Sequence, residues 1–196
     1  WMVRHTSGYL CAPMTEERAD QLGLPLMWPT SQDPLRTRYT VAVDAACGIT
    51  TGIDAAQRAR TARVLADATS TPTDLVRPGH VLPLRARAGG VLERRGHTEA
   101  AVDLARLAGL EPVGLIGELV GDDGMCLRAD AIADLACAEG LAFITIDQLA
   151  QWRRVHDTVL AAPPRRVMAL ASAQLPTRYG HFTIAGYRDN LTGAEH

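Results

Sequence analysis

The chain has 196 residues, of which 47% are hydrophobic, with a formal net charge of -2 and a pI of about 6.3. This length and composition suit a folded domain and exclude a disordered or fibrous chain, and the charge excludes the basic face that nucleic-acid binding requires. No apolar run reaches the roughly 18 residues of a membrane span, and the first residues lack the apolar segment of a signal peptide. We expect neither a membrane nor a nucleic-acid partner.

All 20 basic residues are arginine, a bias that GC-rich coding explains. The absence of lysine nevertheless excludes Schiff-base chemistry, pyridoxal-phosphate attachment and a phosphate-binding P-loop lysine. The four cysteines are scattered and form no CxxC pair, which favours reduced thiols in the cytoplasm over a disulfide framework or a zinc site.

The first half of the chain predicts two helices and a strand. Residues 15–24 form an amphipathic pattern that Thr15 can cap and Gly23 can close. Residues 38–45 alternate and are rich in β-formers, which predicts a strand, and the alanine-rich residues 53–67 predict a helix.

The middle of the chain predicts strands around its clearest helix. Residues 80–86 and the apolar residues 112–120 favour strands, and residues 89–95 favour a further short one. Residues 97–110 form a helical pattern with Thr98 as the expected N-cap.

The later segments continue the alternation, with a helix at 129–141, a strand at 142–146 and a helix at 147–162. Such alternation of helices and strands predicts an α+β domain of the layered α/β type. We expect a mixed β-sheet flanked by helices, in a single main domain.

Residues 163–173 begin with two prolines and read as a linker, and residues 174–196 return to β-type alternation. This last stretch is too short to fold alone. Since the chain also begins within a helical pattern and without Met, we expect it to be a fragment.

The segment RRGHT at 94–98 stands directly before a helix. Free backbone N–H groups and the helix dipole at such a start attract anions, and Arg94 and Arg95 can add charge-assisted hydrogen bonds. Gly96 allows a close backbone approach, and the Thr98 hydroxyl can reach an oxygen. The alternative is an ordinary capped helix with solvated arginines.

Two histidines follow glycines in this region. A neutral His97 imidazole can bind a divalent metal whose other ligands are carboxylates and water. His80 follows a Pro-Gly turn that can aim its ring into a cleft. Each is open to the alternative of a loop histidine without a ligand.

Glu118 lies in the apolar segment LIGELV. It is either a strand-end acid in solvent or a partly buried acid suited to proton transfer. The hydroxyl-rich turn ACGITTG, which contains Thr51, can contact a phosphate or polyol, or simply connect a strand to a helix. Cys11 reads as a small buried residue rather than a reactive thiol. The remaining acids of this region read as solvated or capping charges: Glu93, Glu99, Asp103, Asp122 and Asp123.

Several segments together resemble one family. VRHTSGYLCAP, GITTGI, RPGHVLPLRA, GGVLERRGHTEAAVDLARLAGL and GELV occur in the order found in 3,4-dihydroxy-2-butanone-4-phosphate synthase. The tail LPTRYGHFTIAGY resembles the opening of GTP cyclohydrolase II, which is fused behind the synthase in many bacteria. The resemblance implies a synthase domain at 1–162, a linker at 163–173 and the beginning of a cyclohydrolase domain at 174–196.

The resemblance implies a lyase that converts D-ribulose 5-phosphate to 3,4-dihydroxy-2-butanone 4-phosphate and formate for riboflavin biosynthesis. A magnesium or manganese ion stabilises the enediolate that forms after proton removal beside a carbonyl. The family is homodimeric. By resemblance, His80 and Glu118 are the essential acid–base residues and His97 is a metal ligand. The implied substrate-binding residues are Thr51, Arg94, Arg95, Gly96, His97, Thr98 and Glu118.

The chain departs from the family pattern at two points. The acidic segment that supplies a second metal ligand is absent from the 196 residues, so we expect this chain alone to be inactive. Gln57 stands where the family usually has aspartate. Two alternatives to the synthase are a silent dimerisation domain for a fused cyclohydrolase and a metal-dependent sugar-phosphate isomerase or aldolase of another family.

Overall fold

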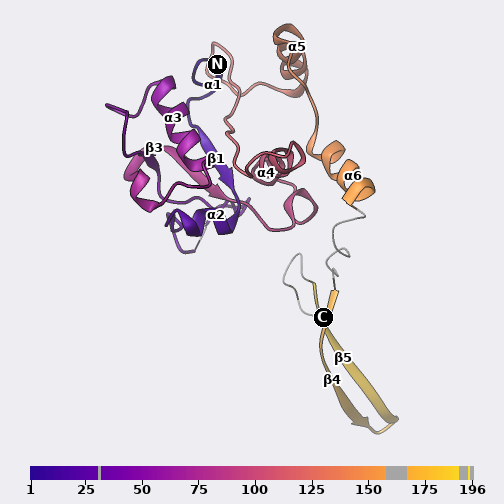
Figure 1. The fold of residues 1–196 in the computed structure, drawn as a ribbon. Helices are drawn as coiled ribbons and strands as arrows, with labels where there is room; N and C mark the ends of the chain where they lie inside the picture. The colour runs from indigo at the N-terminus through magenta and orange to yellow at the C-terminus, as the bar shows by residue number, and fades with distance from the viewer. Residues whose placement is uncertain (31, 158–166, 190–193, 195–196) are drawn as a thin grey trace. The chain divides into compact units, whose positions relative to one another are not determined.

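The computed structural model describes residues 1–30, 32–157, 167–189 and 194 (Figure 1). These residues form two units, 1–153 and 154–196, which are treated separately below. The helices, in chain order, are α1 (Met2–His5), α2 (Glu16–Gln21), α3 (Ala55–Ala66), α4 (His97–Leu107), α5 (Ala129–Glu139) and α6 (Ile146–His156). Two short 3-10 turns are η1 (Pro72–Asp74) and η2 (Gly90–Leu92).

The first unit is built on a mixed sheet of β1 (Cys11–Met14), β2 (Val43–Ala45) and β3 (Leu75–Arg85). The strand order is β1-β3-β2, with β1 parallel to β3 and β2 antiparallel to it. The predicted α+β class, with a mixed sheet flanked by helices, is therefore confirmed.

The apolar segment 112–120 extends this sheet beyond β1, although not as the regular strand that its sequence predicts. It meets β1 and the residues before it through isolated antiparallel bridges: Met14 with Val113, Cys11 with Ile116, and Thr6 with Leu119. Pro112 has no N–H to donate and two glycines interrupt the segment, so its ladder is discontinuous.

The helices lie on both faces of the sheet. Alternate strand residues Ala12, Met14, Val43 and Val81 are buried on one face, where they join the core cluster that contains Leu65 of α3. Burying a side chain such as Met14 or Leu65 stabilises the fold by roughly 1.5–3 kcal/mol. Helix α4 contacts β1 from the other face, and Figure 1 shows it beside that strand.

Local sequence signals place two of the helix starts correctly. The Thr15 hydroxyl accepts a hydrogen bond from the Arg18 N–H at 3.1 Å, as predicted, and Asp54 caps α3 by accepting from Gln57 N–H at 2.9 Å. The prediction of Thr98 as N-cap of α4 is wrong, because the helix begins at His97 after an extended Gly96. A Cβ at Gly96 would collide with the side-chain ends of Arg94 and Glu99, which pack closely against this glycine.

Two predicted short strands are not strands. The segment 89–95 contains the 3-10 turn η2, where Gly90 has a φ of 60° and Val91 is fully buried. The segment 142–146 leads into α6 without forming a strand, and no described strand pairs with it. Thr145 instead caps α6, since its hydroxyl accepts from Gln148 N–H at 3.1 Å.

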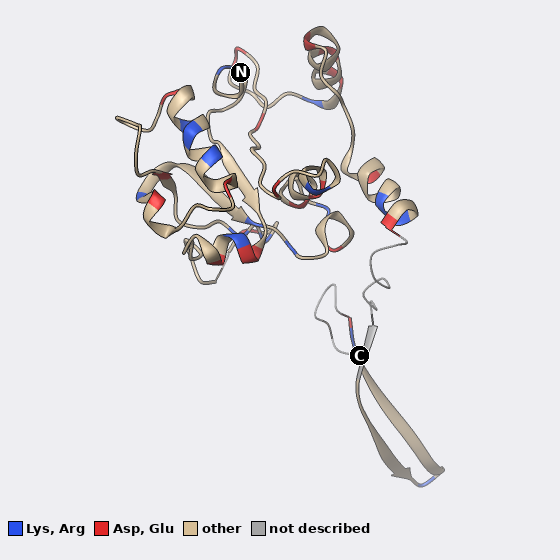
Figure 2. Ribbon diagram, in the orientation of Figure 1, with Lys and Arg blue, Asp and Glu red and all other residues tan. Residues whose placement is uncertain are grey.

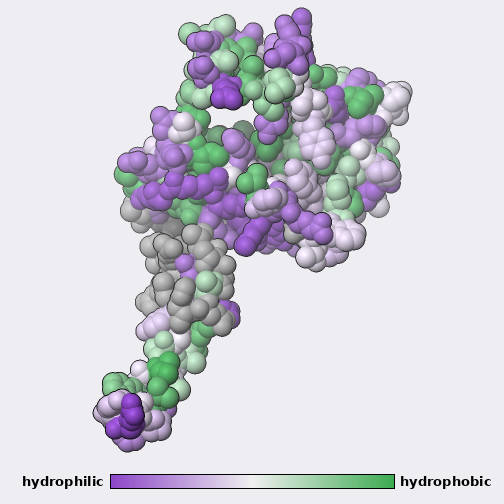
Figure 3. Space-filling model, turned by 180° about the vertical axis from the view of Figure 1, so that it is seen from behind, coloured by the Kyte–Doolittle hydropathy of each residue, from purple (hydrophilic) through white to green (hydrophobic). Residues whose placement is uncertain are grey.

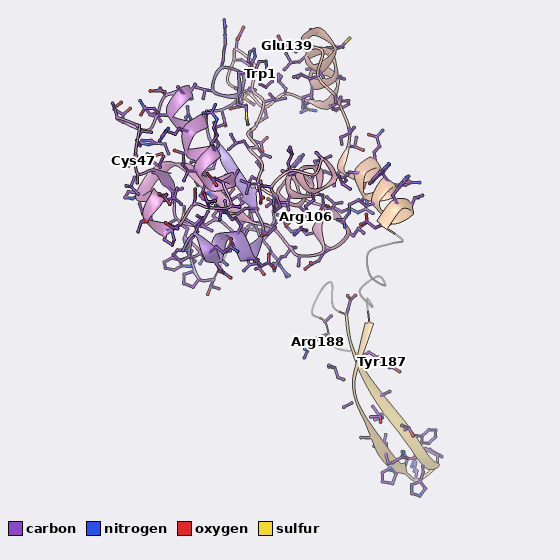
Figure 4. The ribbon with its side chains drawn as sticks, viewed as in Figure 1. Trp1, Cys47, Arg106, Glu139, Tyr187 and Arg188 are labelled. Carbon is purple, nitrogen blue, oxygen red and sulfur yellow. The ribbon has the colours of Figure 1, made fainter. Side chains whose placement is uncertain are left out.

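The N-terminal residue, Trp1, forms a hydrogen bond with α5. The indole N–H of Trp1 donates to a Glu139 carboxylate oxygen at 3.1 Å, and Figure 4 shows the two residues next to each other. Among the described helices, none combines the length and hydrophobicity needed to cross a bilayer.

The second unit contains an antiparallel hairpin of β4 (Val167–Thr177) and β5 (Gly180–Asp189). Strand β4 begins inside the segment 163–173 that the sequence predicts as a linker, whereas residues 158–166 and 190–193 lie outside the described residues. The strands carry few charges (Figure 2), and hydrophobic surface is visible on the hairpin (Figure 3). Apolar side chains such as Phe182 and Ile184 are exposed. An isolated hairpin is marginally stable at best, so these side chains indicate a packing surface.

Candidate active site

The best-defined polar contact of the predicted site joins His80 in β3 to Asp44 in β2. One Asp44 carboxylate oxygen lies 2.6 Å from His80 Nδ1, and the other accepts the His80 backbone N–H at 2.9 Å. The Asp44 side chain is buried, whereas that of His80 is 40% exposed. Because a carboxylate only accepts hydrogen bonds, it places the proton on Nδ1 and leaves Nε2 available.

Backbone packing brings these two side chains together. A Cβ at Gly79 would overlap the backbone of Val43 and Asp44, so only glycine allows the strands to approach this closely. A Cβ at Gly52 would likewise collide with the Asp44 carboxylate and lie 2.9 Å from His80 Nδ1. Gly79 lies inside β3, so the predicted Pro-Gly turn before His80 is wrong, and the glycine serves the pairing of β3 with β2.

The loop that contains Thr51 lies against this pair. Gly52 is buried beside Asp44 and His80, and the exposed Thr51 precedes it. The side-chain oxygen of Gln57 accepts the N–H groups of Thr50 and Gly52, at 3.0 and 2.6 Å. Gln57, which departs from the family pattern, thus holds the loop in place through its amide.

Glu118 is exposed, which matches the alternative of an acid in solvent. Its backbone carbonyl accepts the Ser7 N–H at 2.9 Å. Its carboxylate is close enough to contribute to the raised pKa of Cys11, for which burial is the larger cause.

Strand register relates Glu118 to His80. Cys11 is paired with Leu82 on one side and with Ile116 on the other. His80 precedes Leu82 by two residues, and Glu118 follows Ile116 by two in the antiparallel direction. His80 and Glu118 thus lie near the same end of the sheet, and alternation from Leu82 and Ile116 indicates the same face, although the register of residues 6–11 against 112–120 shifts by two between the Cys11 and Thr6 bridges.

Helix α4 lies over this same face. Gly114, which shares the alternation of Ile116 and Glu118, packs so closely on Ala101 that a Cβ there would lie 3.0 Å from the Ala101 side chain. Ala101 is one turn from His97, the exposed first residue of α4. The structure thus brings the start of α4 to the face that carries His80 and Glu118, although no hydrogen bond among the described residues joins His97 to either.

The segment before α4 is held by its own contacts. Arg94 donates to Glu99 at 2.6 Å, to the Leu35 carbonyl at 2.8 Å and to the Thr37 hydroxyl at 3.2 Å. Arg95 forms an exposed ion pair with Asp147, and Thr98 is buried within the first turn. The backbone N–H groups of the first turn, from His97 to Glu99, find no partner among the described residues.

Glu99 and Asp103 are not the solvated charges that their sequence context predicts. Glu99 is 1% exposed and binds Arg94 as well as the Arg87 N–H, the latter at 3.0 Å. Asp103 is 2% exposed and binds Arg153. Their helical pattern indicates a polar face, but the arginines that cover this face come from other segments.

Asp44 is the functional candidate that sequence reasoning missed. It lies between Val43 and Ala45 in a strand, the same signal of an acid in an apolar segment that singled out Glu118. A carboxylate that is 4% exposed needs hydrogen-bond donors, and His80 supplies two.

Cys11 is buried, whereas Cys47 (labelled in Figure 4), Cys126 and Cys137 are exposed. Burial, with a smaller contribution from Glu118, raises the pKa of the Cys11 thiol from 9.0 to about 11. We therefore expect iodoacetamide at pH 8 to alkylate the three exposed cysteines of the folded chain and to spare Cys11, as read by peptide mass spectrometry.

The same thiol predicts a pH effect on stability. The unfolded thiol ionises near pH 9 and the folded one near 11, so its contribution is complete below pH 9 and is lost between pH 9 and about 11. In urea titrations a Cys11→Ala variant should lack this part of the alkaline loss, on the order of 2 kcal/mol. Rapid alkylation of Cys11 in the folded chain would contradict both expectations.

No group of three or more His, Cys, Asp or Glu side chains within the described residues is arranged to hold a metal ion. His97 by itself does not meet the needs of a magnesium ion, which prefers several oxygen ligands in octahedral geometry.

Comparisons with known proteins find relatives of the whole chain and solved structures with the same fold. Riboflavin biosynthesis protein RibBA of Salinispora tropica is 52% identical over 196 residues, which cover 100% of this chain and 47% of the relative. A crystal structure of a 3,4-dihydroxy-2-butanone 4-phosphate synthase in complex with two magnesium ions matches with a TM-score of 0.76 and 45% identity, over 80% of this chain and 78% of that one. RibBX of A. baumannii, a two-domain synthase, matches with a TM-score of 0.75 and 39% identity, over 99% of this chain and 55% of that one.

The sequence profile of the 3,4-dihydroxy-2-butanone 4-phosphate synthase family matches residues 1–152, and the chain belongs to this family. Membership excludes an isomerase or aldolase of another family. The chain spans about half the length of the curated relatives it matches.

Proposed function

We propose that the protein carrying this chain converts D-ribulose 5-phosphate to 3,4-dihydroxy-2-butanone 4-phosphate and formate in riboflavin biosynthesis. The observation that most directly supports the proposal is the pairing of three sheet segments, which indicates that His80 and Glu118 lie near one end of the sheet. Enolisation of a ketose needs an acid and a base on the same substrate, and these two side chains provide them.

In this proposal His80 transfers protons through Nε2, the ring nitrogen that Asp44 leaves free. Asp44 also stabilises the imidazolium that forms when His80 accepts a proton. Glu118 exchanges the second proton with the substrate. The segment that carries it lies on the side of residues 6–10 that is opposite to β3 and His80. Thr51, beside the His80–Asp44 pair, contacts substrate hydroxyl groups.

The start of α4 receives the phosphate. Its unpartnered N–H groups and the helix dipole favour an anion there, and Gly96 lets the anion approach the backbone. Arg94, Arg95 and Thr98 complete the proposed contacts. Glu99 neutralises part of the Arg94 charge, so the backbone N–H groups supply much of the binding.

We propose His97 as a ligand of a magnesium or manganese ion. This rests on the family resemblance and on the two magnesium ions of the related crystal structure. The described residues do not supply the further ligands that such an ion needs. The proton transfers proposed for His80 and Glu118 involve only side chains of this chain.

The remaining proposals concern the whole protein. We propose a cytoplasmic homodimer without nucleic-acid or membrane partners, with residues 1–162 as the synthase and 174–196 as the beginning of a GTP cyclohydrolase II domain. The match to RibBA over the full 196 residues, hairpin included, supports the fused arrangement.

Replacing His97 by alanine tests the function. We expect formate release from ribulose 5-phosphate in the full-length protein to fall by about 10²-fold or more, because ligand loss removes electrostatic stabilisation of the enediolate. Binding of Mn²⁺, followed by electron paramagnetic resonance, should weaken in parallel.

The control is His181→Ala, an exposed histidine of β5. It should leave both measurements unchanged. Formate release that His97→Ala leaves intact, or a full-length protein that releases none, would overturn the proposed function.

A further inference from the structure

Helix α3 carries a buried arginine without an acidic partner. Arg58 is 6% exposed, and no carboxylate among the described residues forms an ion pair with it. Its Nε is buried without any hydrogen-bond partner. A buried guanidinium stays charged and is costly to desolvate, so the hydrogen bond that it does form indicates why an arginine is placed here.

That contact is a hydrogen bond from the Arg58 guanidinium to the carbonyl oxygen of Gly8, at 2.6 Å. Gly8 has a φ of 76°, and its N–H donates to the Thr6 hydroxyl at 3.1 Å, so the chain turns tightly there. Arg58 is 50 residues away in sequence and anchors this turn to α3.

The other side of the turn contacts the strand end that carries Glu118. Ser7 N–H donates to the Glu118 carbonyl at 2.9 Å, and Thr6 forms a bridge with Leu119. A Cβ at Gly117 would lie 3.2 Å from Thr6, so the two segments are in close contact. The turn at residues 6–8 therefore lies between the Arg58 guanidinium and Glu118.

We propose that Arg58 is a positioning residue for Glu118. It holds the Gly8 carbonyl, and through the turn at residues 6–8 it sets where the Glu118 backbone places its carboxylate. Arg58 does not touch the substrate. The proposal rests on the proposed function, in which Glu118 exchanges a proton.

The test compares Arg58→Met, Arg58→Lys and the control Arg63→Gln in the full-length protein. Arg63 lies on the same helix and is exposed. We expect Arg58→Met to lower kcat for formate release by about 10-fold to 100-fold, because small misplacement of a reacting group is costly. KM for ribulose 5-phosphate should change by less than about threefold, since phosphate binding at α4 is untouched.

Arg58→Lys should recover much of kcat, because its ammonium can still donate to the Gly8 carbonyl, and Arg63→Gln should match the unsubstituted protein. The decisive measurement is Arg58→Met in a Glu118→Gln background, where it should lower kcat by less than about twofold further. Additive effects of the two substitutions would overturn the proposal, as would an Arg58→Met variant with unchanged kcat.

Hydrogen exchange distinguishes this failure from a failure of the proposed function. The Ser7 amide, which donates to Glu118, should exchange faster in Arg58→Met than in Arg63→Gln whether or not the protein releases formate. Unchanged exchange at Ser7 would overturn the positioning role by itself, whereas an inactive unsubstituted protein would overturn only the function.

Discussion

Asp44→Asn should lower kcat for formate release by about 10²-fold or more while leaving the fold intact. The carboxylate accepts both the backbone N–H and the Nδ1–H of His80, at 2.9 and 2.6 Å. An asparagine can keep the first hydrogen bond through its oxygen, but its amide then presents a donor to Nδ1. The imidazole proton moves to Nε2, which can no longer act as a base, and general base catalysis contributes about 10²–10⁴-fold.

Two measurements check this expectation. Steady-state assays in the full-length protein give kcat, and nitrogen NMR of the imidazole reports which ring nitrogen carries the proton. Asp130→Asn, an exposed acid in the first turn of α5, is the matched control and should change neither. A kcat for Asp44→Asn close to that of the control would show that His80 does not depend on this carboxylate.

Asp103→Ala should reduce the free energy of unfolding by about 3–5 kcal/mol, the range for breaking a buried ion pair from one side. Asp103 is 2% exposed, binds Arg153 at 2.6 Å and accepts the Val91 N–H at 2.8 Å. Its loss leaves the Val91 N–H buried without a partner and removes a counter-charge from Arg153. Urea unfolding followed by circular dichroism measures the change.

The matched control is Asp134→Ala, an exposed aspartate of α5 for which we expect a change within about 0.5 kcal/mol. A double substitution of Asp103 and Arg153 to apolar residues should be less damaging than Asp103→Ala alone, because no unpaired charge remains. Equal losses of unfolding free energy for Asp103→Ala and Asp134→Ala would show that the buried ion pair of Asp103 and Arg153 does not stabilise the fold.

Much of the fold follows from local patterns. The Thr15 cap and the apolar periodicity of α4 are properties of short segments, and the structure confirms the elements they predict. The strand predicted at 38–45 is confirmed only as β2, Val43–Ala45. The errors include segments 89–95 and 142–146, which no described strand accompanies, and segment 112–120, which forms only isolated bridges. Strand formation needs such a partner, which composition alone does not reveal.

The candidate site also has one part that local sequence predicts and another that depends on the fold. The RRGHT segment by itself indicates a helix start that attracts anions, and the first-turn N–H groups from His97 to Glu99 have no partner among the residues that the structure describes. The pairing of His80 with Asp44 could not be predicted, because the two residues are 36 positions apart and meet only through the contact of Gly79 with β2.

The sequence by itself determined the family, the mixed α+β class and which residue types are available for proton transfer and anion binding. Only the tertiary structure decided which charges are buried and which nitrogen of His80 faces Asp44. The physical reason is that helix starts and alternation depend on neighbours along the chain, whereas desolvation and ion pairing depend on what packs around a side chain. In the sequence, Arg58 and Asp103 cannot be told from solvated charges. Only their burial in the structure distinguishes them from such charges.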